Sequence, residues 1–276
     1  MKFKFLIQSV AAACAVFAMG AASATPTYPD FTINPNAIIG GSAFSSSITA
    51  NDISGQYHEV IYFDTASTFT VSLNFFAQGF NYDDTNPALS QSFTGAQTGL
   101  GSAGGYNLLA ILNGTGHYST SGGVTTFSID PNASGLSVVY DKGAHGGFTA
   151  PTTFDGSYTY NAAGDTLYTL ATGGAMNGNG SVSCTAPNLC GSFGETTSFN
   201  LTNPYGTSFF TSPVPFYPLS LQSGQIEGFP VTVGGSVTSV GTVNVVFAAV
   251  PEPADVALVG IALLGLGLAV KRRRSM

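Results

Sequence analysis

The stretch Phe69-Thr-Val71-Ser-Leu73-Asn-Phe75 decides the fold class, because its apolar and polar residues alternate strictly. Successive side chains of an extended chain point to opposite faces, so this pattern is typical of a strand with one buried face. The same alternation recurs in residues 136–140, 167–170 and 240–247. We therefore expect a protein built mainly from half-buried strands.

Working outward from these segments, about a dozen candidate strands are separated by clusters of small polar residues and glycine, which are typical of turns. Such clusters include Gly114-Thr-Gly116, Gly122-Gly123, Gly146-Gly147, Gly173-Gly174 and Asn177-Gly-Asn179-Gly180. No segment keeps a helical period with caps, and the ambiguous stretch 106–112 fits a buried strand better than a helix. The prediction is one all-β domain over residues 25–249, either an antiparallel β-sandwich or an irregular barrel.

The charge of the chain is low and unevenly distributed. Only 8% of its 276 residues are charged, against roughly 25% in soluble domains. Between Thr25 and Val250 there are twelve acidic residues and one basic residue, Lys142, which gives this segment a formal charge of −11. Such a surface repels polyanions, so nucleic acid is excluded as a direct partner, and the lack of arginine there argues against phosphate binding.

The N-terminus has the pattern of a secretory signal peptide over residues 1–24. Two lysines precede an apolar run, and Ala22-Ser-Ala24 forms a small-residue cleavage site before Thr25. A lipoprotein signal at Cys14 is the less favoured alternative, because no large aliphatic residue precedes that cysteine and the apolar core would be cut short. Export would leave Cys184 and Cys190 in an oxidising compartment, where we expect them to form a disulfide that pins one surface loop.

The C-terminus, residues 250–276, combines three features in a fixed order. The motif Val250-Pro251-Glu252-Pro253 comes first, an apolar run of fifteen residues over 256–270 follows, and Lys271-Arg272-Arg273-Arg274 ends it. The run is shorter than the ~20 residues that cross a bilayer comfortably, and the basic cluster should stay in the cytoplasm. These features predict a transmembrane helix that holds an exported domain at the inner membrane, and a permanent anchor is the simpler alternative.

Residues 250–276 resemble the sorting signal of the PEP-CTERM proteins of Gram-negative bacteria. In that family a membrane protease, an exosortase, recognises and removes the Pro-Glu-Pro motif, the helix and the arginine-rich end. Asp255 and the missing aromatic residue after the motif depart mildly from the usual pattern. The resemblance implies an inner-membrane intermediate, an exosortase partner and release to the cell surface or the exopolysaccharide matrix.

The mature segment is similar to the flocculation-associated PEP-CTERM proteins in short stretches of low chemical specificity. These are Tyr28-Pro-Asp30-Phe31-Thr32, residues 55–61, Cys190-Gly191-Ser192-Phe193-Gly194, residues 209–217 and Leu221-Gln222-Ser223-Gly224-Gln225. This resemblance implies an extracellular role in the aggregation of cells embedded in exopolysaccharide. It implies no catalytic residue.

No stretch of the chain carries a strong catalytic signature. The string Gly99-Leu-Gly101-Ser-Ala-Gly104 matches a dinucleotide fingerprint only as letters, because no clear strand or basic residue accompanies it. His58, His117 and His145 are expected at surface or turn positions. His58 and Glu59 should point to opposite faces of a strand, so they should not act together.

Acidic loop residues give the one candidate metal site. Asp83, Asp84 and Asn86 offer hard oxygen ligands that suit Ca²⁺, with Asp130, Asn132 and Asp141 supplying others. The alternative is that these residues cap backbone groups in turns. We also hypothesise that an acidic domain needs divalent cations to bridge to an acidic polysaccharide.

The sequence singles out no pair of carboxylates such as a glycosidase needs. We therefore predict a non-enzymatic matrix protein without an obligatory cofactor. A secreted polysaccharide-active enzyme, a lyase or hydrolase with a β fold, is the alternative.

Overall fold

The computed structural model describes residues 28–40, 43–83, 88–131, 135–149, 158–161, 164–174, 176–184, 189–227 and 230–248. The predicted signal peptide, with Ala22, Ala24 and Thr25, and the predicted sorting segment from Val250 onward lie outside these residues. Within the described part of the chain, no helix has the length and apolar character to cross a membrane.

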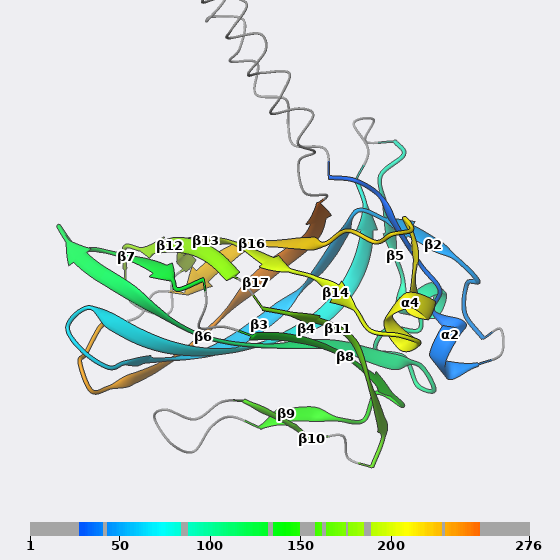
Figure 1. The fold of residues 1–276 in the computed structure, drawn as a ribbon, viewed down its shortest axis with the longest axis horizontal. Helices are drawn as coiled ribbons and strands as arrows, with labels where there is room; N and C mark the ends of the chain where they lie inside the picture. The colour runs from blue at the N-terminus through cyan, green and yellow to red at the C-terminus, as the bar shows by residue number, and fades with distance from the viewer. Residues whose placement is uncertain are drawn as a thin grey trace, which may run out of the picture.

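Eight antiparallel segments, each one strand or two consecutive strands long, form a β-barrel (Figure 1). Five of these segments are single strands: β3 (Asp52–Phe63), β4 (Thr68–Tyr82), β6 (Tyr106–Ser121), β16 (Leu219–Glu227) and β17 (Ser236–Ala248). The other three segments consist of two consecutive strands: β7 (Val124–Ile129) with β8 (Gly135–Lys142), β11 (Thr166–Gly173) with β12 (Met176–Val182), and β13 (Leu189–Ser198) with β14 (Asn200–Leu201). Of the two predicted all-β architectures, the structure is therefore a barrel.

Each segment pairs with the next segment along the chain, and β17 pairs with β3 to close the ring. This is the connectivity of an up-and-down barrel. Closure leaves the long strands of the barrel without a free edge, so their backbone amide and carbonyl groups form hydrogen bonds with the neighbouring strands. The predicted strands at 69–75, 136–140, 167–170 and 240–247 all lie in these segments, and the ambiguous stretch 106–112 opens β6.

Small elements surround the barrel. They are β1 (Phe31–Ile33), α2 (Asn36–Ile39), β2 (Ile48–Ala50), β5 (Gln91–Phe93), α3 (Gly95–Thr98), β9 (Gly147–Thr149), β10 (Thr159–Asn161), α4 (Tyr205–Phe209) and β15 (Phe210–Ser212). The three-stranded sheet β15-β1-β2 lies with α2 and α4 at one end of the barrel (Figure 1). The hairpin β9–β10 lies outside the barrel wall, beside β8.

Aromatic side chains fill both ends of the barrel. At the α4 end, the ring of Phe247 packs against Phe31, Phe199 and Phe216 with centroids 4.8 to 5.1 Å apart. At the opposite end, the rings of Phe63 and Tyr118 lie 5.0 Å apart. Burial of these large rings is a main source of stability for the barrel.

Inward-facing glycines make room for rings on the neighbouring strand. Four pairs lie directly opposite each other: Gly116 with Phe69, Gly180 with Phe127, Gly224 with Phe193, and Gly241 with Tyr57. A Cβ atom on any of these glycines would lie 2.4 to 2.8 Å from the ring. Barrel interiors often alternate small and large residues in this way.

This pairing corrects two predicted turns. The clusters Gly114–Gly116 and Asn177–Gly180 lie inside β6 and β12, where Gly116 and Gly180 leave space for rings rather than bend the chain. The prediction holds for Gly122 and Gly123, which have φ angles of 59° and 80° and connect β6 to β7. The disulfide between Cys184 and Cys190 is also confirmed, with sulfur atoms 1.95 Å apart.

Candidate functional site

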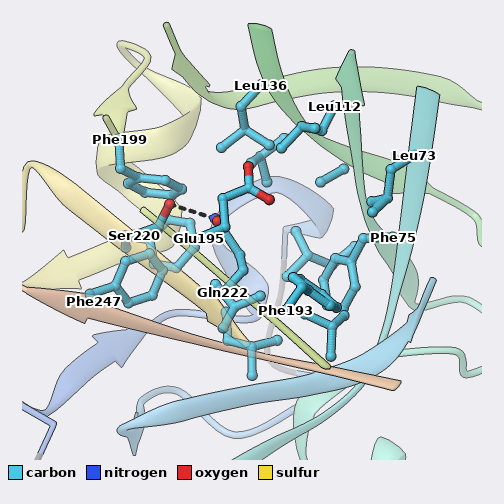
Figure 2. Close-up of a pocket in the computed structure, with 17 residues that line it drawn as sticks. Leu73, Phe75, Leu112, Leu136, Phe193, Glu195, Phe199, Ser220, Gln222 and Phe247 are labelled. Atoms are coloured by element: carbon cyan, nitrogen blue, oxygen red, sulfur yellow. Dashed lines mark hydrogen bonds between the residues drawn. The ribbon is translucent and has the colours of Figure 1, made fainter. Parts of the chain in front are cut away.

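The interior of the barrel contains a row of small chambers. The first, about 60 Å³, is lined almost entirely by aliphatic and aromatic side chains from the walls around it (Figure 2). Two further chambers of about 40 Å³ each follow toward the opposite end. Leu73, Leu112, Phe193 and Glu195 line both the first and the second chamber, so these two are neighbours.

Two glutamates project into this apolar interior. Glu195 on β13 and Glu59 on β3 both line the second chamber, and β16 and β17 separate their strands around the ring. In Figure 2 the carboxylate of Glu195 extends into the space beside Leu112 and Leu136. Because His58 is exposed on the outer face whereas Glu59 is buried, the prediction that these neighbours face opposite ways is confirmed.

The environment of the two carboxylates favours their neutral forms. Burial raises the pKa of Glu59 to about 7, opposed by a hydrogen bond from Ser239. Burial, and then the nearby Glu59 charge, raise the pKa of Glu195 to about 8, opposed by a hydrogen bond from Thr197. In each carboxyl group the buried Oε1 atom has no hydrogen-bond partner. Buried carboxylates with an unpartnered oxygen and a raised pKa are candidates for functional positions.

The chemistry open to this pair is limited by the size of the interior. Two carboxylates could exchange a proton or hold a cation. Pockets that bind drug-sized molecules usually measure ~300–1,000 Å³, whereas the largest of the three chambers measures about 60 Å³. A sugar ring does not fit such a chamber, so the pair gives no support to a polysaccharide-cleaving site.

The outer wall has a different character. One row of directly paired residues runs across seven strands: Ser119, Thr126, Ser181, Ser192, Gln225, Thr242 and Gln56. A second row runs parallel to it: His117, Ser128, Asn179, Gly194, Ser223, Asn244 and Ser54. We call these two rows the polar girdle. Except for His117, its side chains are uncharged, and nearly all of its positions are exposed.

The girdle is hollowed where it crosses β7, β12 and β13. A shallow depression of about 520 Å³ lies there, with Thr126, Asn179, Ser181 and Ser192 in its lining. Phe127 and Phe193 also line it, together with Gly180 and Gly194, which add no side chain. The girdle around this depression is a broad surface of hydroxyl and amide groups, which both donate and accept hydrogen bonds.

A third polar cluster holds the β9–β10 hairpin against the barrel. The buried carboxylate of Asp141 on β8 accepts hydrogen bonds from the Tyr160 hydroxyl, at 2.6 Å, and the Gly146 amide, at 3.2 Å. Asp165 accepts a hydrogen bond from the His145 amide at 2.8 Å, which lowers the pKa of this carboxyl group. The predicted turn role of His145 fits this geometry.

Of the predicted calcium ligands, Asp83, Asp130 and Asp141 lie within the described residues. Asp84 and Asn86 lie outside the described residues, and so does Asn132. The Asp83 amide donates to the Asn51 side chain at 3.0 Å, and the Asn51 amide group donates to the Asp83 carbonyl at 2.8 Å. Among the described residues, no three histidine, cysteine, aspartate or glutamate side chains gather in a metal-binding group.

Glu59 and Glu195 are the residues that sequence reasoning missed as a pair. Their positions carried a signal, because Glu59 has the same strand parity as Tyr57 and Ile61, and Glu195 has the parity of Phe193. An acid in register with large apolar residues is a candidate for burial.

Comparison with known proteins gives no further assignment: no family model matches the chain, and neither a curated protein nor a solved structure is significantly similar to it.

Proposed function

We propose that this protein is an exported, non-enzymatic component of an exopolysaccharide matrix that promotes cell aggregation into flocs or biofilm. Its signal peptide directs export, and its C-terminal segment holds it at the inner membrane until an exosortase cleaves at the Pro251-Glu252-Pro253 motif. The mature barrel then acts at the cell surface or in the matrix of a Gram-negative bacterium.

The polar girdle is the observation that carries this proposal. Polysaccharides present hydroxyl groups in every direction, and the girdle offers matching hydroxyl and amide groups on seven adjacent strands. Direct and water-mediated hydrogen bonds over such an area give weak, repeated contacts. Because the girdle itself has no carboxylate, it avoids local repulsion with acidic sugars despite the −11 charge of residues 25–250.

Two other features support a role outside the cell. The Cys184–Cys190 disulfide persists best in an oxidising compartment. The closed barrel places no long strand edge in solution, which protects an exported protein from edge-to-edge aggregation.

The test uses a strain that lacks the gene, complemented with the full-length chain. Replacing Thr126, Ser192 and Thr242 together by Val removes three girdle hydroxyls on β7, β13 and β17, which are all exposed. We expect weaker aggregation and less protein bound to exopolysaccharide from the same culture. The matched control replaces Thr166, Thr172 and Thr238 by Val, which are exposed strand positions outside the girdle. Equal aggregation by both triple variants would contradict the proposal.

Sorting is tested separately, by intact-mass measurement of protein from the matrix and from a strain without the exosortase. In the native host, we expect the mass of a chain that ends between Val250 and Pro253. In the strain without the exosortase, we expect the protein to stay in the membrane. A mass that still includes Lys271 to Met276 in both strains would identify the tail as a permanent anchor.

A further inference from the structure

The chamber that holds Glu59 and Glu195 is almost purely apolar apart from these two side chains. Val71, Leu73, Leu112 and Ile226 are among its lining residues. Asn179 also borders it, but its paired position in the girdle places its side chain on the outer face. Glu59 and Glu195 are only 7% and 8% exposed, and the Oε1 atom of each lacks a partner.

Within the described part of the chain, no lysine or arginine lies at these oxygens. Lys142 is the one basic residue between Lys4 and Lys271, and its Nζ atom contacts the backbone carbonyl of Ile39, 3.4 Å away. Burying a carboxylate without a partner is costly unless it takes up a proton, and a bound cation would offset part of the cost of keeping it charged.

The chemistry of the lining selects the kind of cation. Ca²⁺ takes six to eight oxygen ligands, whereas this chamber offers only two carboxylates among apolar walls. A primary ammonium group brings three N–H donors on an aliphatic stem. The stem would enter the first chamber, where Leu112, Leu136 and Val138 line a space of about 60 Å³. At ~10–15 Å³ for each water-sized group, this space suits roughly four to six non-hydrogen atoms.

We propose that the barrel interior binds a small primary alkylamine, with its ammonium group between Glu59 and Glu195 and its aliphatic chain in the first chamber. This inference does not depend on the proposed matrix function. The wall next to the carboxylates contains Gly178 and Gly194, and Asn179, Phe193 and Gly194 line both the inner chamber and the outer depression. The two glycines in this part of the wall carry no side chain that would have to move when a ligand enters.

The experiment is calorimetric titration of the full-length protein with n-butylamine, with 1-butanol as a neutral probe of the same length. We expect saturable binding of n-butylamine with one molecule per chain and much weaker binding of 1-butanol. Glu195→Gln and Glu59→Gln keep the side-chain shape and remove the charge. Each should weaken n-butylamine binding about ten-fold or more, the effect of one charge-assisted hydrogen bond. The matched control Asp64→Asn removes an exposed carboxylate and should leave binding unchanged.

A second variant keeps both carboxylates and fills the space. Ala110→Leu places a larger side chain in the first chamber, and it should abolish n-butylamine binding without removing any charge. Equal binding of 1-butanol and n-butylamine, unaffected by the glutamine variants, would overturn the proposal in favour of a simple apolar cavity. No binding of n-butylamine to the folded protein, or its displacement by Ca²⁺ alone, would overturn it as well.

Discussion

The inner and outer walls of this barrel are made by the same strands, yet they differ in almost every physical property. The inner wall pairs glycine with aromatic rings and places two carboxylates among aliphatic side chains. The outer wall carries rows of serine, threonine, asparagine and glutamine. Because neighbouring residues alternate between the two walls, stability and surface chemistry are encoded at interleaved positions. A substitution that affects one wall should therefore leave the other largely unchanged.

The largest expected effect is the pH dependence of stability, which arises on the inner wall. The pKa values of Glu59 and Glu195 rise from 4.5 to about 7 and about 8 on folding. The folded barrel therefore keeps protons that the unfolded chain has released, so the stabilising contribution of these two groups is complete below about pH 4.5 and is lost as the pH rises through 7 to 8. We expect a loss of several kcal/mol between pH 5 and pH 9, measured by urea unfolding.

Glu195→Gln provides the control for this trend, because an amide of the same shape does not titrate. The variant should reduce the dependence of the urea midpoint on pH to the part that arises from Glu59, whereas Asp64→Asn on the exterior should leave it unchanged. Identical midpoints at pH 5 and pH 9 for the wild-type protein would show that the two glutamates are not buried together.

The second effect concerns the glycine–aromatic pairs of the inner wall. A Cβ at Gly180 would lie 2.4 Å from the Phe127 ring and 2.7 Å from the Ser192 carbonyl oxygen, whereas a Cβ at Gly194 meets no atom within 4 Å. We expect Gly180→Val to lower the free energy of unfolding by about 3 kcal/mol, and Gly194→Val to change it little. Chemical denaturation of both variants measures this difference, and equal destabilisation would refute the assignment of inner and outer faces.

A smaller effect is expected at the disulfide, which joins Cys184 to Cys190 near the start of β13. Cys184 and Cys190 are six residues apart in sequence, so their bond closes a short loop and restricts the unfolded chain only modestly. Replacing both by Ser should cost about 2 kcal/mol, measured by thermal unfolding without reductant. Dithiothreitol should lower the stability of the wild-type protein to that of the double variant. A larger loss would mean that the bond supports the barrel itself.

The sequence predicts the strands because the alternation of apolar and polar residues can be recognised within a single strand, without knowing its neighbours. Closure is a different matter, since the pairing of β17 with β3 joins residues such as Val243 and Gly55 that are far apart in the chain. No local signal separates a barrel from a sandwich. The same limit explains why two glycine clusters inside strands were wrongly predicted as turns. Gly180 can be recognised as a partner of Phe127 only when the register of β12 and β7 is known.

The candidate sites follow the same rule. The parity of Glu59 with Tyr57 indicated an inward position, but only ring closure brings Glu59 and Glu195 to one chamber. The girdle was equally hidden, because Ser192 and Thr242 become members of one row only through the strands that connect them. Composition predicts that hydroxyl and amide side chains are abundant, and register determines that they form a continuous surface.

The smallest effect on stability, and the sharpest separation of the two walls, is expected for the girdle. The hydroxyl groups of Thr126, Ser192 and Thr242 lie on exposed strand positions, where substitutions usually change stability by less than about 0.5 kcal/mol each. Valine also suits a strand, so the triple variant should unfold at nearly the wild-type urea concentration. Its binding to neutral polysaccharide should nevertheless fall, whereas Glu195→Gln should bind polysaccharide normally. Binding to an acidic polysaccharide should additionally weaken when EDTA removes divalent cations, because the protein and the polymer carry the same sign of charge. If Glu195→Gln lost polysaccharide binding and the girdle variant kept it, the two walls would have exchanged the roles assigned to them.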